Sequence, residues 1–445
     1  MLSVSNWCVG DLLGPVSFEV APGQRLGIIG ESGSGKSLTA LSIMQLLPED
    51  LPTRGSITRG DAKIAMVFQE PMSALDPLMR IRKQLRYAGA DPAEALASVD
   101  LDPALAARYP HELSGGQRQR VLIAMAMAQQ PDLLICDEPT TALDASTQDG
   151  ILDLLEELVT ARGTALLFIT HDLRVLRRMC PEAIVMRDGQ IVESGDVLTH
   201  PTQDYTKQLI AASEPKPPGP APQLGEPIIT LEHVSKHYGK AIALNDVTLS
   251  VRQGERLGVV GGSGSGKTTL LKLISGLSQP SSGRVDVAKR VQMVFQDPQG
   301  SLNPRLPIWR SVAEGKKGAS RAEVAAILEE VGISGSLERY PHEFSGGQRQ
   351  RISIARALIG KPDILLADEA VSALDVSVRA QILDLLERLV NAHGLTLVFI
   401  SHDLRVVRQI CSSVAVIYRG SIVESGDIWE NPQHEYTKKL IAAAR

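Results

Sequence analysis

The chain has 445 residues, of which 43% are apolar and 22% charged, and its formal net charge is −5. This balance gives no sign of a nucleic-acid-binding surface, which would need a basic patch or stripe. No apolar run reaches the roughly 18–20 residues that a helix needs to span a bilayer, so any work on a membrane must rely on partner proteins. The four cysteines lie far apart and form no CxxC pair. We therefore expect reduced thiols of a cytosolic protein, with no disulfide frame or metal site built from them.

The first strong motif is a phosphate-binding loop, which follows an apolar run at residues 26–29 and precedes a helix-compatible stretch at 38–47. It fits the pattern G-x-x-x-x-G-K-[ST], in which glycines let backbone N–H groups surround phosphate oxygens at a helix N-terminus. The first copy consists of Gly30, Glu31, Ser32, Gly33, Ser34, Gly35, Lys36 and Ser37. A second copy consists of Gly261, Gly262, Ser263, Gly264, Ser265, Gly266, Lys267 and Thr268. We predict two nucleotide sites, in which the lysine reaches the outer phosphates and Ser37 or Thr268 ligates Mg²⁺.

The whole domain is repeated along the chain, which takes priority over length in deciding the domain count. Lys36 and Lys267 are 231 residues apart (267 − 36), and Glu138 and Glu369 have the same separation (369 − 138). A Pro-rich stretch between the copies is expected to be extended and semi-rigid. We predict a first domain over residues 1–212, a linker over 213–227 and a second domain over 228–445.

Each copy alternates short apolar runs with helical periodicity, which predicts an α/β fold with a mostly parallel core sheet. Buried parallel strands are predicted at residues 133–136 and 165–169, and a strand–turn–strand at 183–192. Apolar residues spaced as one helix face follow the first of these strands. They are Ile151, Leu154, Leu155 and Leu158, repeated as Ile382, Leu385, Leu386 and Leu389.

A more helical region is expected within each copy, over residues 71–131 and 298–362. In the second of these regions, Ser320 with Glu323 predicts a helix start by a capping box.

An acidic pair ends one predicted strand in each copy, as Asp137-Glu138 and Asp368-Glu369. Ligands of parallel sheets bind at the carboxyl ends of the strands, which is where these side chains fall. Such a pair can also serve only to cap a helix, but the phosphate loop upstream favours catalysis. We expect Asp137 and Asp368 to hold Mg²⁺, mostly through water, and Glu138 and Glu369 to orient and deprotonate the attacking water.

Single polar residues end two further predicted strands in both copies. They are Gln69 and Gln296, each after Met-Val-Phe, and His171 and His402, each before an aspartate. A lone glutamine or histidine at a strand end is usually a plain loop residue, but recurrence at the same sheet edge favours a role. We expect the glutamines to sense Mg²⁺ and the γ-phosphate, and the histidines to hydrogen-bond the γ-phosphate.

A second anion-binding helix start is predicted in each copy, where a serine and two glycines precede a helix. These residues are Ser114, Gly115, Gly116 and Gln117, repeated as Ser345, Gly346, Gly347 and Gln348. As a turn and cap the motif would be unremarkable, but in a domain that already has a phosphate loop it implies binding of ATP held by a partner domain. Ala-Leu-Asp follows each acidic pair, which places Asp144 and Asp375 at the expected interface.

These motifs, in this order, resemble the ATPase domains of ABC transporters over nearly all of both halves. The serine-glycine-glycine-glutamine motifs correspond to the signature of that family. Segments before the signature (108–112 and 339–343) and in the tails (200–206 and 431–437) are similar to the oligopeptide, dipeptide and nickel importer ATPases. The resemblance implies two tandem P-loop NTPase domains, each with an antiparallel β subdomain and a helical subdomain. It also implies an ATPase that drives uptake of a small solute, such as a peptide, nickel or a metal chelate.

The resemblance further implies partners and cofactors. ATP and Mg²⁺ would lie at two composite sites formed by head-to-tail pairing of the halves, each combining one phosphate loop with the opposite signature. Two transmembrane permease subunits would receive the motion, and an extracytoplasmic solute-binding protein would deliver the solute. The protein would be peripheral on the cytoplasmic face of the inner membrane, with no nucleic acid bound. The main alternative is a tandem ABC translation factor acting on ribosomes, but such proteins usually carry a long charged helical linker.

One departure from the family pattern concerns the aromatic residue that stacks on adenine. Tyr238 fits this position in the second half, whereas the first half is truncated there and Trp7 does not align convincingly. We therefore expect weaker ATP binding at the first site, unless Trp7 or an apolar side chain substitutes.

Overall fold

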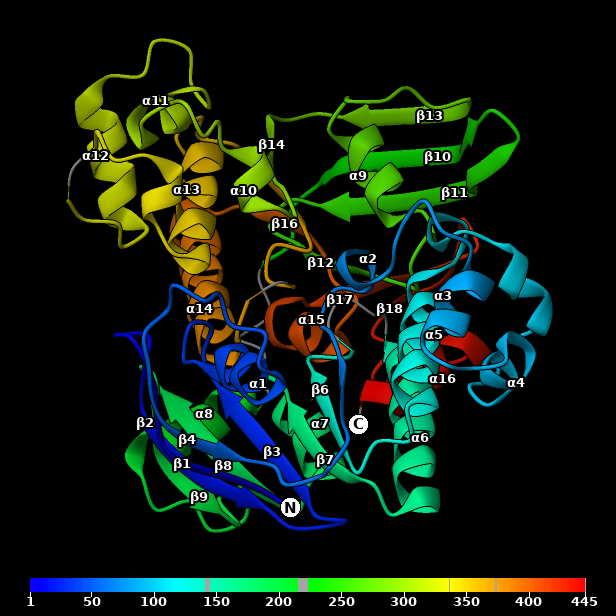
Figure 1. Cartoon of the computed structure of the whole chain (residues 1–445). Helices are drawn as coiled ribbons and strands as arrows, with labels where there is room; N and C mark the ends of the chain where they lie inside the picture. Colours follow the sequence, from blue (N-terminus) through cyan, green and yellow to red (C-terminus); the bar gives the residue numbers. More distant parts are fainter. Residues whose placement is uncertain (141–144, 215–222, 336, 373, 445) are drawn as a thin grey trace. The chain divides into compact units, whose positions relative to one another are not determined.

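The computed structural model describes residues 1–140, 145–214, 223–335, 337–372 and 374–444. It divides into two compact units, with the boundary along the chain after Glu214. Figure 1 shows the elements of both, which are described below one unit at a time. Most of the predicted linker, residues 215–222, and the predicted interface residue Asp144 lie outside the described residues.

The first unit contains a three-stranded antiparallel sheet and a six-stranded core sheet, and helices follow most core strands. Its strands are β1 (Leu2–Val9), β2 (Leu13–Val20), β3 (Arg25–Gly30), β4 (Thr53–Thr58), β5 (Ile64–Val67), β6 (Leu133–Asp137), β7 (Ala165–Ile169), β8 (Glu182–Arg187) and β9 (Gln190–Gly195). Its helices are α1 (Lys36–Met44), α2 (Pro71–Ala74), α3 (Ile81–Tyr87), α4 (Pro92–Ala97), η1 (Pro103–Ala107), η2 (Pro110–Glu112), α5 (Gly115–Ala128), α6 (Ala145–Arg162), α7 (Leu173–Met179) and α8 (Asp204–Ser213).

The second unit repeats this plan. Its strands are β10 (Pro227–Tyr238), β11 (Ala241–Arg252), β12 (Arg256–Val260), β13 (Ser282–Val287), β14 (Val291–Val294), β15 (Ile364–Asp368), β16 (Thr396–Ile400), β17 (Ser413–Tyr418) and β18 (Ser421–Gly426). Its helices are α9 (Lys267–Ile274), α10 (Pro298–Ser301), α11 (Ile308–Ala313), α12 (Arg321–Glu330), η3 (Pro341–Glu343), α13 (Gly346–Leu358), α14 (Val376–His393), α15 (Leu404–Ile410) and α16 (Glu435–Ala444).

The core sheets have the same strand order in both units, β5-β6-β7-β3-β8-β9 and β14-β15-β16-β12-β17-β18. All neighbouring strands run parallel except the last pair of each sheet, β8 with β9 and β17 with β18. In this order the strand before the phosphate loop, β3 or β12, lies next to β7 or β16, which ends two residues before the histidine. The predicted α/β class with mostly parallel core sheets is confirmed.

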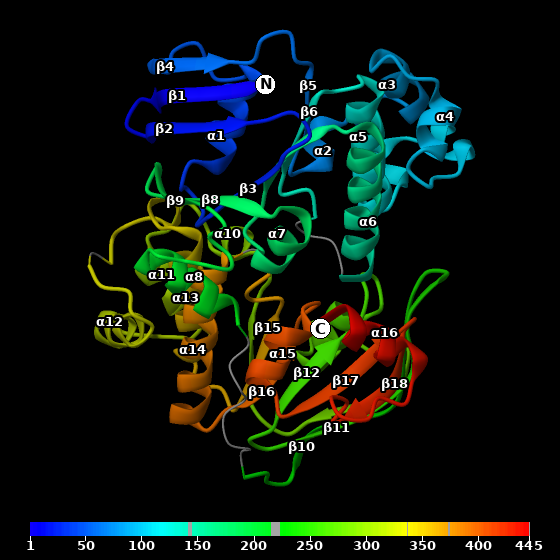
Figure 2. The ribbon, with the colours of Figure 1, turned by 90° about the horizontal axis from the view of Figure 1, so that it is seen from below.

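The helical part of each unit is built around one long helix. In the first unit, α2, α3 and α4 pack against α5, and in the second, α10, α11 and α12 pack against α13 (Figures 1 and 2). The predicted capping box is present, because the backbone N–H of Glu323 donates to Ser320 Oγ and the Glu323 carboxylate accepts from the Ser320 N–H.

The helix after the first phosphate loop is shorter than the predicted stretch of residues 38–47. It ends at Met44 because Gln45 adopts a left-handed conformation with φ of 59°, and its N–H turns back to the carbonyls of Leu41 and Ser42.

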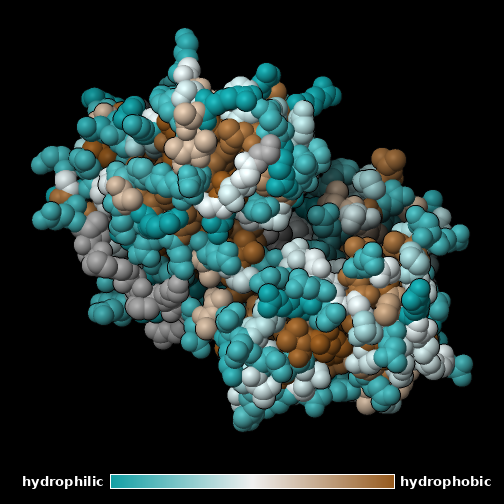
Figure 3. All heavy atoms as spheres, turned by 90° about the vertical axis from the view of Figure 1, so that its left-hand side faces the viewer, coloured by the Kyte–Doolittle hydropathy of each residue, from teal (hydrophilic) through white to brown (hydrophobic). Residues whose placement is uncertain are grey.

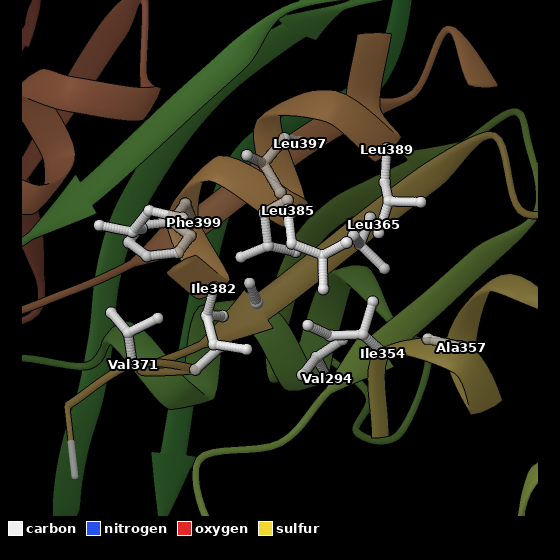
Figure 4. Close-up of a cluster of buried hydrophobic side chains, with 14 of the residues drawn as sticks. Val294, Ile354, Ala357, Leu365, Val371, Ile382, Leu385, Leu389, Leu397 and Phe399 are labelled. Carbon is white, nitrogen blue, oxygen red and sulfur yellow. The ribbon is translucent and has the colours of Figure 1, made fainter. Parts of the chain in front are cut away.

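The core strands are buried on both faces, so their side chains form two separate clusters in each unit. In the second unit, Leu365, Leu397 and Phe399 lie in the cluster that also contains α14 residues, of which Figure 4 shows Ile382, Leu385 and Leu389. Alternate residues of the same strands, such as Leu366 and Val398, pack instead with α9 and the antiparallel sheet. This division follows from the two-residue period of a strand.

The outer surface that Figure 3 shows is mainly hydrophilic, with apolar side chains gathered in limited patches. Within the described ranges, no helix combines the length and the apolar character needed to cross a membrane.

Candidate nucleotide-binding sites

The first phosphate loop connects β3 to α1, and the second connects β12 to α9. The lysine side chains are buried and point back into their own loops. Lys36 Nζ donates to the carbonyls of Gly30 and Glu31, both at 2.8 Å. Lys267 Nζ donates to the carbonyls of Gly261 and Gly262 at 2.7 and 2.9 Å. Burial lowers the pKa of Lys36. The loops thus hold each ammonium at the position where phosphate is expected to bind.

The glycine before each helix is required by the fold. Gly35 and Gly266 have φ of 97° and 111°, in the left-handed region that favours glycine. A Cβ at Gly35 would lie 2.6 Å from Leu13 Cδ1, and one at Gly266 would lie 2.5 Å from the Ala243 carbonyl oxygen. The hairpin of the antiparallel sheet therefore packs directly against the phosphate loop in each unit.

Two of the three predicted Mg²⁺ residues of each unit lie together, namely the aspartate at the end of β6 or β15 and the hydroxyl residue at the start of α1 or α9. Asp137 and Asp368 are each 5% exposed, and burial raises the pKa of both carboxyl groups. The Ser37 hydroxyl hydrogen-bonds Asp137, and Thr268 does the same for Asp368. The Oδ1 atom of each aspartate is buried and has no hydrogen-bond partner among the described residues. An unpaired carboxylate oxygen beside a hydroxyl is the kind of oxygen ligand set that Mg²⁺ takes, so these residues fit the ion.

The predicted glutamine and histidine of each unit converge on the glutamate that is the predicted general base. In the first unit, Glu138 Oε2 accepts a hydrogen bond from Gln69 Nε2 at 3.0 Å and lies 3.1 Å from His171 Nδ1. The second unit repeats the cluster with 2.9 Å from Gln296 Nε2 to Glu369 Oε2 and 3.4 Å from His402 Nδ1. The hydrogen bond with His402 lowers the pKa of Glu369. The glutamine and the histidine, which follow two other strands, therefore meet at the carboxylate that follows β6 or β15.

The backbone of each glutamate is unusual. Glu138 and Glu369 have φ of 47° and 44°, a left-handed conformation that few residues other than glycine adopt. Their N–H groups donate to the carbonyls of Ile169 and Ile400 at 2.9 and 3.1 Å, across to the neighbouring strand. Strained backbone of this kind clusters at functional sites because the surrounding structure must hold it in place.

The serine-glycine-glycine motifs begin α5 and α13, as predicted for a helix start. Ser114 Oγ accepts from the Gln117 N–H at 3.3 Å, while Gln117 Oε1 accepts from the Ser114 N–H at 2.9 Å. Ser345 and Gln348 form the same capping box. The serine and glutamine side chains thus cap the helix start in each unit, in addition to the predicted anion-binding role. Asp375 lies directly before α14.

The β1–β2 and β10–β11 hairpins differ in length near the position predicted for the adenine-stacking residue. In the second unit, Lys236 pairs with Leu244 and Tyr238 with Ala241 near the hairpin tip. The corresponding pair in the first unit is Val9 with Leu13. Val9 and Leu13 are four positions apart (13 − 9), whereas Lys236 and Leu244 are eight apart (244 − 236), so the first hairpin is four residues shorter. Tyr238 is 50% exposed and has no counterpart on the shorter hairpin.

Trp7 occupies a different place on the antiparallel sheet. It pairs with Val16 as Val234 pairs with Val247, and its ring packs against the apolar cluster between the sheets. Trp7 therefore belongs to the core of the first unit and does not replace Tyr238.

A tyrosine of each C-terminal tail was missed as a site residue. Tyr205 and Tyr436 are 231 residues apart (436 − 205), and the Gly262 N–H of the second phosphate loop donates to the Tyr436 hydroxyl at 2.7 Å. Recurrence at the domain offset was the available signal, but sequence alone gives no reason to place a tail helix beside the loop.

Two stretches of the chain, residues 13–141 and 244–372, match the protein family described as ABC transporter. The chain belongs to this family. Its members hydrolyse ATP to power transport, and this ABC protein is accordingly an ATPase with two ABC domains.

Among curated proteins, the ABC chain is 43% identical to the peptidoglycan transport ATP-binding protein YejF of Agrobacterium fabrum, over 96% of this chain and 92% of that protein. It is 38% identical to the glutathione import ATP-binding protein GsiA of Salmonella typhimurium, over 97% and 86%. It is also 37% identical to the oligopeptide transport ATP-binding protein OppD of Mycobacterium tuberculosis, over 96% and 94%.

Among solved structures, the archaeal ribosome recycling factor aABCE1, in complex with the ribosomal stalk protein aP1, superimposes with a TM-score of 0.74. The identity is 20%, and the match covers 98% of this chain and 92% of the other. At this identity the likeness concerns the fold alone.

Proposed function

We propose that this ABC ATPase is the ATP-hydrolysing subunit of an importer that takes up a small solute through separate membrane permease subunits. The observation that carries the proposal is the glutamine–glutamate–histidine cluster, which is complete in both units. The names of the sequence relatives support the transport of peptide-containing solutes. Nickel or a metal chelate remains a further candidate solute, on the resemblance of the tail segments.

In each unit, we assign binding of the triphosphate to the phosphate loop and its lysine. Ser37 with Asp137, and Thr268 with Asp368, would hold Mg²⁺ together with Gln69 and Gln296. When bound, the ion neutralises charge on the phosphate oxygens. Burial of the negative charge raises the pKa values of the two aspartates despite the nearby lysines, and a bound divalent ion would offset that cost.

The glutamates would act as general bases toward the attacking water. Glu369 has a lowered pKa because His402 hydrogen-bonds its carboxylate, which keeps the base ionised at neutral pH. Gln69 and His171 fix the Glu138 carboxylate from two sides, and a fixed carboxylate loses less entropy when it aligns the water. The histidines would also donate to the γ-phosphate.

Each complete site would need both halves. Head-to-tail pairing would bring Ser345, Gly346, Gly347 and Gln348 to the first phosphate loop, and Ser114, Gly115, Gly116 and Gln117 to the second. Asp144 and Asp375 would lie at the same interface. The support for this arrangement is chemical, because a helix start with two glycines offers backbone donors to phosphate oxygens.

A groove of about 350 Å³ in the second unit is a candidate docking surface for a permease. It lies beside the strand that ends before Gln296, and Leu277, Phe295 and Arg356 are among its lining residues. Leu277 is 64% exposed and Phe295 40%, although both are apolar. Leu46, the residue 231 positions earlier, is likewise 52% exposed in the first unit. Permease binding at the inner membrane would cover this apolar surface, and a solute-binding protein outside would feed the permease.

A photo-crosslinking residue at position 277 of the full chain tests this assignment in cells. We expect an adduct with a multispanning membrane protein in the membrane fraction. The matched control carries the same residue at position 224, where Leu224 is 43% exposed outside the groove. Adducts of position 277 with ribosomal proteins alone would overturn the importer assignment in favour of a translation factor, whose support at present is likeness of fold.

A further inference from the structure

The C-terminal helix of the second unit is tied to the phosphate loop. Tyr436 lies in the first turn of α16, and its hydroxyl accepts a hydrogen bond from the Gly262 N–H at 2.7 Å. Gly262 is the second residue of the phosphate loop, directly before the serine and glycines that are expected to contact phosphate. The contact joins residues 174 positions apart in the chain, so the tail reaches back to the start of the unit.

The tail is held firmly enough to serve as a support. Glu424 on β18 accepts hydrogen bonds from the N–H groups of Gln433 and His434 at 2.7 and 3.0 Å, directly before α16 begins. The ring of Tyr418 at the end of β17 lies 4.3 Å from the ring of Tyr436, measured between centroids. The tyrosine hydroxyl is therefore positioned by the core sheet through two contacts.

The first unit has the same tail but a different contact. Glu193 on β9 accepts from the N–H groups of Thr202 and Gln203 at 2.6 and 3.2 Å, so the tail is anchored as in the second unit. The Tyr205 hydroxyl is buried and interacts with the backbone of Glu31, but it does not form the close hydrogen bond that Tyr436 makes in the second unit. Arg187 covers the ring at 4.9 Å.

The residue that faces the hydroxyl explains the difference. A Cβ at Gly262 would lie 3.2 Å from the Tyr436 oxygen, which is closer than most Cβ contacts, so glycine permits the short approach. The first unit has Glu31 at this position, which carries a side chain where the second unit has none. The close bond is thus found where the loop residue is glycine, and the looser contact where it is glutamate, which points to a specific contact rather than general packing.

We propose that Tyr436 is a positioning residue for the second nucleotide site, whose hydroxyl fixes the start of the phosphate loop before nucleotide arrives. The proposal rests on the nucleotide-binding function proposed above. A loop that is already ordered loses less conformational freedom when it binds, so its affinity for phosphate is higher. The first site, with Glu31, has this support only in a looser form.

Single-site variants of the full chain test the proposal. With Lys36→Ala silencing the first site, Tyr436→Phe is expected to raise the Kd for Mg·ATP by roughly three- to tenfold, the size of a lost hydrogen bond. With Lys267→Ala silencing the second site, Tyr205→Phe is expected to change the Kd less than about twofold, because no close hydrogen bond is lost. In the otherwise unmodified chain, Tyr436→Phe should raise KM for ATP while kcat stays within about twofold. A merely unfolded fraction would lower kcat and leave KM unchanged.

A second variant measures the contact itself. Gly262→Ala should raise the Kd for Mg·ATP when Tyr436 is present. In the Tyr436→Phe background, where the hydroxyl is already absent, adding Gly262→Ala should raise the Kd little further. Equal Kd values for Tyr436→Phe and its parent, or additive effects of the two substitutions, would overturn the proposal. Unchanged ATP binding in Lys267→Ala would instead overturn the assignment of the nucleotide site.

Discussion

The side-chain amide of Gln69 donates to the Glu138 carboxylate at 3.0 Å, and the pair is reproduced by Gln296 and Glu369 at 2.9 Å. Each glutamine stands between the edge strand of the core sheet, β5 or β14, and the first short helix of the helical part, α2 or α10. The carboxylate that is proposed to activate water is therefore bonded to the connection between the two parts of its unit. A shift of the helical part would move the hydrogen-bond donor and so change the position of the base.

The proposed general bases lead to the first prediction. Glu138→Gln combined with Glu369→Gln should lower ATP turnover at least about 10²-fold, since a general base typically contributes 10²–10⁴-fold. ATP binding should persist, because the lysines and the phosphate loops are unchanged. Steady-state hydrolysis and equilibrium binding of Mg·ATP to the full chain measure the two effects. Glu157→Gln, on the exposed side of α6, is the control and should leave turnover unchanged. Near wild-type turnover in the double variant would remove the glutamates from the catalytic assignment.

The second prediction separates fold from function in the signature motif. A Cβ at Gly347 would lie 2.4 Å from Val378 Cγ1, whereas a Cβ at Gly346 would meet no atom within 4 Å. Gly347→Ala should therefore destabilise the second unit by about 1–3 kcal/mol, the usual range for overpacking. Gly346→Ala should leave the unfolding free energy unchanged within about 0.5 kcal/mol, as for other surface substitutions. If this glycine faces phosphate in a composite site, its alanine variant should nevertheless lose ATP turnover.

Urea unfolding and ATPase assays of the full chain test the glycine pair. Val378→Ala should restore stability to the Gly347→Ala variant, because it removes the clashing methyl group. Stability losses of equal size in the two glycine variants would show that the steric explanation is wrong. Full activity of Gly346→Ala would count against a signature that contacts nucleotide.

The sequence was sufficient for the parts of the fold that depend on local pattern. The predicted strands at 133–136 and 165–169 correspond to β6 and β7, and Ser320 caps α12 as its spacing with Glu323 indicates. Motif order alone also identified the family, because two copies of six short motifs rarely coincide by chance.

Features that depend on packing between distant segments could not be read in this way. The place of Trp7 was obscured because the shorter hairpin shifts the register of β1 against β2 by four residues relative to the second unit. The bond from Gly262 to Tyr436 joins a loop and a tail helix, and no periodicity records such a contact. The left-handed backbone of Glu138 follows from its bond to the neighbouring strand, which local propensity does not predict.

The third prediction concerns pH and a buried ion cluster next to His402. Burial alone would raise the pKa of Asp403, but Arg405 and Arg379 outweigh it and lower the pKa to about 2. Arg405 donates to both carboxylate oxygens at 3.0 and 2.9 Å. Since the pKa is about 3.9 in an unfolded chain, the ionised group stabilises the fold above pH 4, and this contribution is lost as pH falls from about 4 to 2.

Asp403→Asn should therefore destabilise the second unit at neutral pH by about 2 kcal/mol, the size expected for such a pKa difference. The difference from wild type should be constant between pH 5 and 8 and should shrink below about pH 4. Chemical unfolding across this range measures it. Asp172→Asn is the matched control with a smaller expected effect, because Gln148 stands where Arg379 stands in the second unit. A difference that varied between pH 5 and 8 would contradict the assignment to Asp403.

The last prediction is that the two sites differ in how they hold the base of ATP. Tyr238 stands near the tip of the longer hairpin, and the first unit lacks the four residues that would carry a counterpart. Stacking of a base on an aromatic ring contributes roughly 1–3 kcal/mol, and 1.4 kcal/mol is about tenfold in affinity. With the other site silenced by Lys36→Ala or Lys267→Ala, the first site should bind ATP several-fold to about a hundredfold more weakly than the second.

Binding of inorganic tripolyphosphate separates the contribution of Tyr238 from that of Tyr436, because this ligand has phosphates but no base. Tyr238→Ala should weaken ATP binding at the second site about tenfold, in line with one lost stacking contact, and leave the affinity for tripolyphosphate unchanged. Tyr436→Phe should weaken both ligands alike, since it acts on the phosphate loop. Equal ATP affinities of the two sites, with no loss in Tyr238→Ala, would mean that phosphate contacts dominate and that the longer hairpin contributes nothing to nucleotide binding.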